Sequence, residues 1–408
     1  MATIVLACGC ECGVGGGVSS HFPTSTGTGT GEFVTATKRG GLRSLHFLTT
    51  SAQRAYFRQD GVLTLGTRIF VVSFYLRFTS LPAEDTGIWF ASDAGETAYI
   101  GVGFNAATGK IECYQGTSTT VYTFAGGGVT PTLGLWYRVD ARVNTTANPW
   151  TCDAQINGTA LTQSTRASAA ANPAIIGIGL NPMDNAGAAE IHVDDIIYSQ
   201  TSGDYPLGAH YIVSYIPNAD GTHNVAGAND FEYSGTGVDI TNASTDVYTL
   251  VDDRPLETTL TDYINLVAPP NATDYVECLF GNETEGAAPL AVETIMAVQS
   301  AGTLANNLRV ALVDKNGSTQ ADVLNGDISE TSLFYKRAIS TVIPGGGAWT
   351  EVAFNALAFR AYTNDASPDP YLASIMLEAV FAGDPNFGAW IPQESSIPTR
   401  NPVPIIAY

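Results

Sequence analysis

Apolar and polar residues alternate with a period of two along many short stretches of this chain. The clearest stretches are Leu135–Val143 and Ala189–Tyr198, which alternate for most of their length, as a strand with one buried face requires. Between them, Thr151–Ile156 runs into Asn157-Gly158, a dipeptide typical of two-residue β-hairpin turns. The pattern predicts a strand, a hairpin and a closing strand within a β-sandwich.

Further strand signals lie on both sides of this unit, and Gly, Asp and Asn residues separate most of them. In the first half we expect strands at 54–57, 67–78, 87–92, 98–104, 110–114, 121–124 and 174–180. In the second half we expect strands at 263–266, 274–279, 293–299, 308–313, 332–337 and 371–381, and one short helix within 349–359. Many short strands at this spacing indicate sandwiches or barrels.

The fold class that we expect is therefore all-β, with two β-sandwich (jelly-roll) domains and extended N- and C-terminal arms. The expected segments are an arm with the first strand at 1–34, a jelly roll at 35–203, a connection at 204–245, a second sandwich at 246–383 and a Pro-rich arm at 384–408. The last segment holds too few periodic apolar residues to fold alone, so we expect it to lie over a neighbouring molecule.

Composition narrows the classes of function. Of the 408 residues, 45% are hydrophobic, enough for two cores, and only 14% are charged, which leaves uncharged polar surfaces suited to packing in an assembly. The formal net charge of −21 and the lack of any basic run argue against binding to nucleic acid or to an anionic membrane. Residues 1–8 lack a cationic segment and are too short for a secretory signal, so we expect synthesis in a cytoplasm.

Several segments, taken in order, are similar to a known family. They are Leu6–Gly13, Lys38–Leu45, Val193–Tyr198, Ile216–Gly221, Tyr248–Pro255 and Gly347–Leu357. Together they resemble tailed-bacteriophage virion proteins with a LamG-like (concanavalin A-like) jelly roll, although Cys10 and Cys12 depart from the family's entry turn. The resemblance implies a multi-copy structural protein of the virion, either a head decoration or a tail-associated component. Its implied partners are other copies of itself and other virion proteins.

Carboxylates near the end of the closing strand suggest two kinds of chemistry. Jelly-roll glucanases place two carboxylates about 5–9 Å apart on either side of the scissile bond. Glu190, Asp194 and Asp195 approach that pattern but lack its terminal Glu, so we expect no enzyme here. Asp194 and Asp195 are instead candidates for a structural calcium ion, which prefers oxygen ligands. The alternative is that one caps a turn while the other is solvated. No other cofactor is expected.

Aromatic residues in the first domain offer an alternative function. Trp89, Tyr99 and Tyr114 are candidates for a glycan-binding platform, and Trp89 and Tyr99 are expected on adjacent strands. Such a platform would make the protein a lectin-like adhesion module of a tail fibre that binds a host surface glycan. The competing interpretation is that these rings belong to a sandwich core.

Three cysteines near the start, Cys8, Cys10 and Cys12, share one face of an extended strand. Their spacing is at or beyond the reach of a disulfide, and no second cysteine pair or suitably spaced histidine completes a zinc motif. We expect small buried hydrophobic side chains here, with a metal or redox role as the alternative. Candidate contacts between copies are Cys8, Cys10, Cys12, Phe387, Trp390 and Tyr408.

Overall fold

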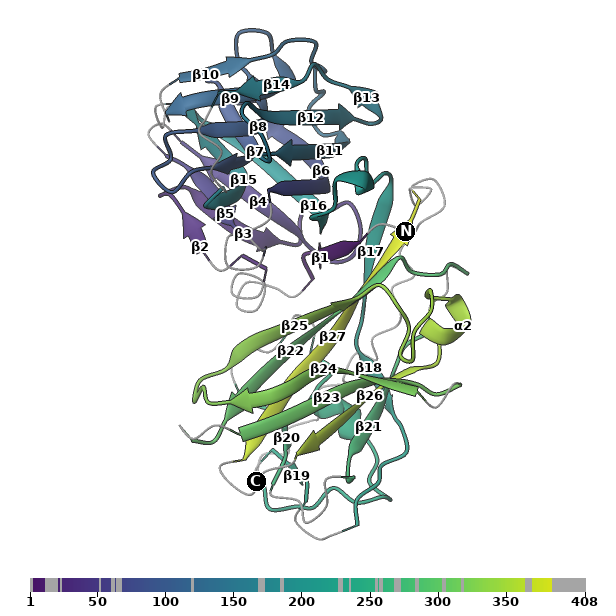
Figure 1. Cartoon of the computed structure of the whole chain (residues 1–408). Helices are drawn as coiled ribbons and strands as arrows, with labels where there is room; N and C mark the ends of the chain where they lie inside the picture. The colour runs from purple at the N-terminus through teal and green to yellow at the C-terminus, as the bar shows by residue number, and fades with distance from the viewer. Residues whose placement is uncertain are drawn as a thin grey trace.

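The structure is a computed structural model of the chain, shown in Figure 1. It describes residues 3–11, 21–22, 24–50, 53–59, 63, 68–118, 121–167, 173–183, 187–226, 230–234, 236–253, 256, 260–267, 273–282, 286–302, 306–316, 319–363 and 369–383. The expected C-terminal arm at 384–408, with Phe387, Trp390 and Tyr408, lies outside these residues, and so does Cys12.

The first domain is a sandwich of two antiparallel sheets. In spatial order the first sheet contains β13 (Thr159–Ala160), β12 (Trp150–Ile156), β11 (Trp136–Asn144), β6 (Ile69–Ser80), β16 (Ala189–Ser199), β4 (Ser44–Thr49) and β3 (Thr30–Val34), with β1 (Ile4–Cys8) against β16 and β14 (Ser164–Arg166) against β12. The second sheet contains β10 (Val121–Phe124), β9 (Lys110–Ser118), β8 (Tyr99–Asn105), β7 (Thr86–Ser92), β15 (Ile175–Pro182), β5 (Ala55–Arg58) and β2 (Thr24–Thr26).

The sequence pattern explains these strands. In β12 the residues Trp150, Cys152, Ala154 and Ile156 are buried and the residues between them are half-buried, so one face of the strand enters the core. The expected hairpin is confirmed, because β12 pairs with β13 across a two-residue turn at Asn157-Gly158. Both turn residues have positive φ (50° and 83°), as this type of turn requires.

The second domain is also a sandwich of two antiparallel sheets. One contains β19 (Glu232–Tyr233), β20 (Ile264–Asn265), β27 (Pro370–Ala382), β22 (Ala291–Ser300) and β25 (Phe334–Ser340), with β17 (His210–Tyr215) against β27. The other contains β18 (Pro217–Asp220), β21 (Val276–Phe280), β26 (Leu357–Thr363), β23 (Asn306–Asp314) and β24 (Thr319–Ile328). The all-β class with two sandwiches is thus confirmed.

The described helices are short. They are η2 (Ser202–Asp204), η3 (Val247–Leu250) and α2 (Glu351–Phe354). Thr350 caps α2 by accepting a hydrogen bond from the backbone N–H of Ala353 (3.1 Å), but the helix covers only the middle of the expected 349–359 segment, and β26 begins at Leu357. None of the helices within the described residues has the length and apolarity of a membrane span.

The structure moves two of the expected segment boundaries. Residues 1–34 are expected to hold an arm and one strand, yet three strands, β1, β2 and β3, all pair with strands of the first sandwich. Residues 204–245 were expected to be a connection, yet β17, β18 and β19 pair with strands of the second sandwich. Two of these strands, β2 and β19, have only three and two residues, too few to show a period in the sequence.

An apolar cluster joins the two domains where β1 and β17 meet (Figure 1). Its buried members come from both sandwiches and are Ile4, Ala7, Ile197, Ile212, Ala291 and Val380. Strand β1 therefore belongs to the first sheet by hydrogen bonding and touches the second domain with its outer edge. We call this region the domain junction.

Candidate functional site

The free edge of β1 is satisfied by carboxylates from the second domain. Alternate backbone N–H groups point to the same edge of a strand, and here those of Ala7, Gly9 and Glu11 point away from β16. Ala7 donates to Glu293 Oε2 (2.7 Å) and Gly9 donates to Glu378 Oε2 (2.9 Å). Glu11 donates to Glu378 Oε1 over a longer distance of 3.4 Å. Two side chains thus replace a neighbouring strand, which removes an open edge.

Glu293 and Glu378 are direct cross-strand neighbours on β22 and β27, and both are fully buried. Arg337 Nη1 donates to Glu293 Oε1 (2.6 Å), and His21 Nε2 lies 3.5 Å from Glu293 Oε2. Burial raises the pKa of Glu293, but His21 and Arg337 outweigh it and hold that pKa below its usual value. Burial and the Cys8 thiol raise the pKa of Glu378 far above its usual value. The two shifts have opposite directions, so the charged form is favoured at Glu293 and disfavoured at Glu378.

A second polar group lies at the junction around Arg39, whose side chain is 1% exposed. Its guanidinium pairs with Asp195, donates to the carbonyl of His210 (3.2 Å) and lies 3.3 Å from the ring centroid of Tyr75. Asp195 also accepts from the backbone N–H of Ile212 in β17 (3.0 Å). The group consequently ties the end of β16 to the first strand of the second domain.

A β-bulge places the Asp195 side chain at this position. The register between β16 and β6 shifts between Asp194 and Ile197, and Asp195 has a φ of 48°. Bulges bend a strand and redirect side chains, and Asp tolerates the left-handed region better than most residues. The paired aspartates of the sequence therefore mark a bend that turns one carboxylate toward the second domain.

The expected calcium role of Asp194 and Asp195 is not supported by their surroundings. Asp194 accepts from the backbone N–H groups of Arg39 (2.8 Å) and Asp195 (2.9 Å), while Asp195 pairs with the Arg39 guanidinium. Nitrogen donors and a cation occupy the oxygens that calcium would need. Neither carboxylate is solvated, since both are at most 2% exposed. The structure uses the two residues to hold the junction together.

Two groups of side chains within the described residues have donor atoms close enough to hold a metal ion. The first is Cys8, His21 and Glu378, all buried at the junction, with donor atoms within 4.8 Å of one another. The second is His46, Glu190 and His192, at the surface of the first sheet. There His46 Nε2 lies 3.1 Å from Glu190 Oε1, and the two imidazole rings stack at 4.8 Å.

The cysteines do not act as contacts between copies. Cys8 and Cys10 are fully buried inside the chain, so the expectation that they join sister molecules is wrong. Cys10, Cys113, Cys152 and Cys278 are free thiols. The expectation that they are small buried residues is confirmed for Cys8 and Cys10.

Aromatic side chains gather on the outer face of the second sheet of the first domain. This aromatic face consists of Tyr56, Phe90, Tyr99, Tyr114, Tyr122 and Ile175. Tyr99 and Tyr114 of the expected glycan platform are both here, each in ring contact with Tyr122 at centroid distances of 6.0 and 4.8 Å. Both rings are fully buried, so no ring face is exposed for a sugar to stack on.

Trp89 does not belong to the platform, so this part of the expectation is wrong. Its side chain points into the sandwich core and its Nε1 donates to the hydroxyl of Tyr198 (2.8 Å). In the pairing of β7 with β8, Trp89 faces Val102 while Tyr99 faces Ser92. Because side chains alternate along a strand, Trp89 and Tyr99 lie on opposite faces of one sheet.

The aromatic face contains polar atoms without a hydrogen-bond partner. The Tyr114 hydroxyl and both side-chain polar atoms of Asn181 are buried and unpaired. The hydroxyl of Tyr114 lies over Gly87, 2.2 Å from the position of a Cβ there, and Gly87 pairs with Asn181 in the neighbouring strand. Buried polar groups are nearly always satisfied, so these atoms call for a partner such as water or a ligand.

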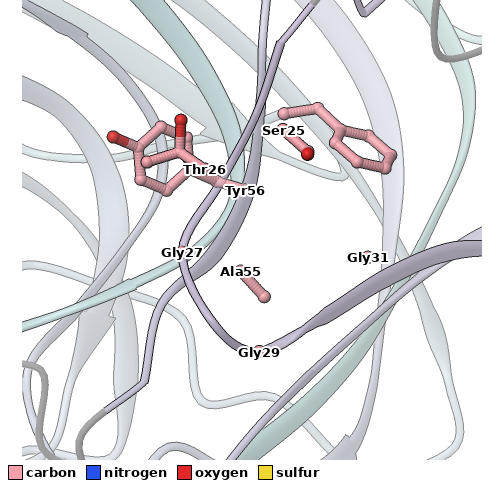
Figure 2. A pocket seen from close by; sticks show the side chains of 8 residues that line it. Ser25, Thr26, Gly27, Gly29, Gly31, Ala55 and Tyr56 are labelled. Carbon is pink, nitrogen blue, oxygen red and sulfur yellow. The ribbon is translucent and has the colours of Figure 1, made fainter.

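A pocket beside β2 and β5 is lined by no charged side chain. Its lining residues are Ser25, Thr26, Gly27, Gly29, Gly31, Ala55, Tyr56 and Phe57 (Figure 2). None of these side chains is charged, and the Tyr56 hydroxyl donates to Glu96 (2.8 Å). We therefore place no site there.

The sequence analysis missed the most highly connected residues of the junction. His21, Glu293 and Glu378 were not among the candidates. A signal for the two glutamates was present, because each interrupts an otherwise apolar central strand, and a charge in such a strand must find partners. For His21 the sequence holds no comparable signal.

Similar proteins were found by comparing structures but not by comparing sequences. The sequence matches no protein-family model and no curated protein. A solved structure titled "Cellulose induced protein, Cip1" aligns with 13% identity and a TM-score of 0.33, covering 44% of this chain and 92% of that one. The CBM22-1-CBM22-2 tandem domain of Paenibacillus barcinonensis Xyn10C aligns with 10% identity and a TM-score of 0.28, covering 93% and 98%.

A sialidase from Trypanosoma rangeli, solved with the inhibitor DANA, aligns with 15% identity and a TM-score of 0.32. That alignment covers 42% of this chain and 27% of the sialidase. Similarities this low carry no argument about function, which rests on the geometry above.

Proposed function

We propose that this protein is a multi-copy structural component at the surface of a tailed-bacteriophage particle, without enzymatic activity. The observation that carries the proposal concerns the segments on which the family resemblance rests. Leu6–Gly13, Lys38–Leu45 and Val193–Tyr198 are far apart in sequence, yet they supply β1, Arg39 and the bulge of β16, which meet at the domain junction. The resemblance thus coincides with the residues that fix one sandwich to the other.

A fixed junction suits a structural subunit. Domains in one chain move relative to each other unless their interface is extensive and apolar. Here an apolar cluster is flanked by two buried polar groups, those of Glu293 with Glu378 and of Arg39 with Asp195. Breaking such buried groups is costly, because each leaves a charge or an N–H without a partner. Two sandwiches held in one orientation form a rigid subunit, which can pack against its neighbours in a particle in one defined way.

Strand edges offer a means of association between copies. β24 is the last strand of its sheet, and half of its ten residues are exposed while only one is buried. An unpaired strand edge can add a strand from another molecule, and the small share of charged residues, 14%, leaves mostly uncharged surfaces for such packing.

The carboxylates closest to a glucanase pattern support the absence of catalysis in this proposal. Glu190 lies at the surface beside His46, whereas Asp194 is buried against the backbone of Arg39. A retaining or inverting pair would need both carboxyl groups to face one substrate groove.

The test uses particles purified from the phage that encodes this chain. Quantitative mass spectrometry of banded particles should find the protein at a copy number that follows the particle's symmetry, and cryo-electron microscopy should resolve both sandwiches at its surface. Recovery of the protein only from the soluble lysate, and never from banded particles, would overturn the proposal.

Glycan binding is the second candidate, and the unpaired Tyr114 hydroxyl with Asn181 is the observation that favours it. Sugar hydroxyls both donate and accept, but both side chains are fully buried, so a sugar reaches these atoms only where the aromatic rings over them move aside. A glycan array probed with wild-type protein and with Tyr114→Phe tests this, because the variant removes only the hydroxyl. Trp89→Ala is unsuitable, since it opens a cavity in the core. Binding that is unchanged in Tyr114→Phe, or absent from the wild type, eliminates this candidate at the aromatic face.

A further inference from the structure

We propose that Cys8, His21 and Glu378 bind a zinc ion at the domain junction, with the Cys10 thiol as the fourth donor. The site goes beyond the proposed structural role and is independent of it.

The three donors converge from distant parts of the chain. Cys8 ends β1, His21 follows it by 13 residues, and Glu378 lies on β27 of the second domain. Their donor atoms all lie within 4.8 Å of one another, and all three side chains are fully buried. Removing a thiol, an imidazole and a carboxylate from water together is unfavourable unless they are paired or coordinate a cation. Their convergence is therefore a specific feature of the fold.

The donor set selects the metal. Zinc takes sulfur, nitrogen and carboxylate oxygen in a four-coordinate tetrahedron, with bonds of about 2.0–2.3 Å, which sets neighbouring donors roughly 3.5 Å apart. A spread of up to 4.8 Å closes to that geometry by small side-chain rotations. Calcium and magnesium require oxygen ligands, so a thiol and an imidazole disfavour them.

The backbone brings a fourth donor, the Cys10 thiol, beside Cys8, although its sulfur lies outside the set of donor atoms that all fall within 4.8 Å of one another. Cys10 has a φ of 66°, in the left-handed region that non-glycine residues adopt at a cost of about 1–2 kcal/mol. This turn follows β1 directly and brings the Cys10 thiol into hydrogen-bonding contact with Cys8. Cys10 is also fully buried, with its sulfur 3.9 Å from the carbonyl oxygen of Val193. The strained backbone of Cys10 holds its thiol beside Cys8 of the metal-binding group, as expected for a further ligand of the same ion.

The neighbours of the site supply outer contacts. Gly9 and Glu11 donate backbone N–H groups to the Glu378 carboxylate, which orients it and leaves lone pairs for a metal. Glu293 lies 3.5 Å from His21 Nε2 and is itself held by Arg337. A carboxylate beside a ligating histidine is the usual outer partner in zinc sites.

The chain offers a matched control. Cys113 and Cys152 also form a contact between two buried thiols, but in the core of the first domain. No histidine or carboxylate joins them in either of the groups able to hold a metal among the described residues. A pair of thiols alone should not retain zinc.

The experiment begins with full-length protein purified without added metal or chelator. Plasma mass spectrometry should find close to one zinc per chain in the wild type and in Cys152→Ala, and at least a tenfold lower content in Cys8→Ser and His21→Asn. Cobalt(II) titrated into chelator-treated wild type should give the sulfur-to-cobalt charge-transfer absorption of a tetrahedral thiolate site. Cys8→Ser should abolish this absorption.

The cobalt titration keeps the test decisive if a variant fails to fold, because it uses the wild-type chain. Wild-type protein that contains no zinc and gives no charge-transfer absorption with stoichiometric cobalt overturns the site. An absorption that persists in folded Cys8→Ser, or a disulfide between Cys8 and Cys10 in the purified protein, overturns it as well.

Discussion

Glu293 and Glu378 face each other directly across β22 and β27, fully buried, and both cap the edge of a strand from the other domain. Like charges opposite one another in a sheet destabilise it. Here the free edge of β1 offers backbone N–H groups to both carboxylates, and Arg337 pairs with Glu293, whose pKa is held below its usual value. The first domain therefore supplies backbone N–H donors, and the second domain supplies the carboxylates that accept from them.

Removing the charge of Glu293 should weaken the junction. Glu293→Gln keeps an oxygen for the N–H of Ala7 but removes the negative charge that pairs with the guanidinium of Arg337, which is 17% exposed. We expect a loss of roughly 2–4 kcal/mol in the free energy of unfolding, measured by urea titration. Glu84→Gln, at an exposed position, serves as the control and should change the free energy by less than about 0.5 kcal/mol. Equal losses in both variants would contradict the role given to Glu293.

Arg39 should couple the two domains. Arg39→Met leaves Asp195 buried without its cation, and we expect a loss of roughly 3–5 kcal/mol in the free energy of unfolding. The double variant Arg39→Met/Asp195→Asn should recover part of that loss, and a double-mutant cycle in urea measures the coupling. Faster protease cleavage between 200 and 209 in Arg39→Met would report the loosened junction. Additive effects of the two substitutions would argue against a direct interaction.

A buried carboxylate in the second domain should make its stability depend on pH. Glu277 pairs with Lys315 and with Arg360 Nε (2.7 Å) and accepts from the backbone N–H of Thr222 (2.9 Å). Burial raises the pKa of Glu277, but Lys315, Thr222 and Arg360 outweigh it and lower that pKa below its usual value. A lowered pKa stabilises the fold above the pKa of the unfolded chain, about 4.3, and this stabilisation is lost as the pH falls through the folded pKa.

We therefore expect wild type to exceed Glu277→Gln in free energy of unfolding by roughly 1–3 kcal/mol near pH 7. The figure is discounted because Lys315 is 34% exposed. The difference should shrink as the pH is lowered toward about 3, as measured by urea unfolding at each pH. A difference that stays constant over this interval would show that Glu277 acts through shape and not through charge.

A glycine beneath an aromatic ring should tolerate no side chain. A Cβ at Gly177 would lie 2.3 Å from the ring of Phe90, so Gly177→Ala should overpack the aromatic face and lower the free energy of unfolding by roughly 1–3 kcal/mol. Gly40→Ala is the matched control, since a Cβ there meets nothing within 4 Å and its φ is not in the left-handed region. The melting temperatures of both variants, measured by thermal unfolding, test this: that of Gly177→Ala should be the lower one. Equal melting temperatures would mean that the ring moves aside freely.

The sequence was sufficient to predict the strands that bury one regular face. Alternation located β11, β12 and β16 to within a residue, and Asn157-Gly158 located the hairpin. It did not locate β24, where half of the ten residues are exposed and only one is buried, so the strand has no regular apolar face. An edge strand is held mainly by backbone hydrogen bonds, and these do not depend on side-chain type.

The site was harder to predict than the fold. The run around Trp89 in β7 is apolar on both faces, so nothing in it decides which side enters the core. Asp194 and Asp195 were correctly singled out but given the wrong partner, because Arg39 reaches them from 155 and 156 residues away. His21 becomes part of the junction only through packing of distant segments. Such contacts leave no local pattern.

The capping of β1 has a consequence for synthesis on the ribosome. Gly9 donates to Glu378, which is 369 residues further along the chain. At roughly 5–20 residues per second, the ribosome adds Glu378 about 20–70 s after Gly9. Until then the backbone N–H groups on the outer edge of β1 lack this acceptor. During that interval the first sandwich emerges with an open strand edge next to Cys8, which is buried in the finished fold. Nascent chains on one polysome could then pair through β1, so a chaperone or slow β1 docking would protect the yield of native protein.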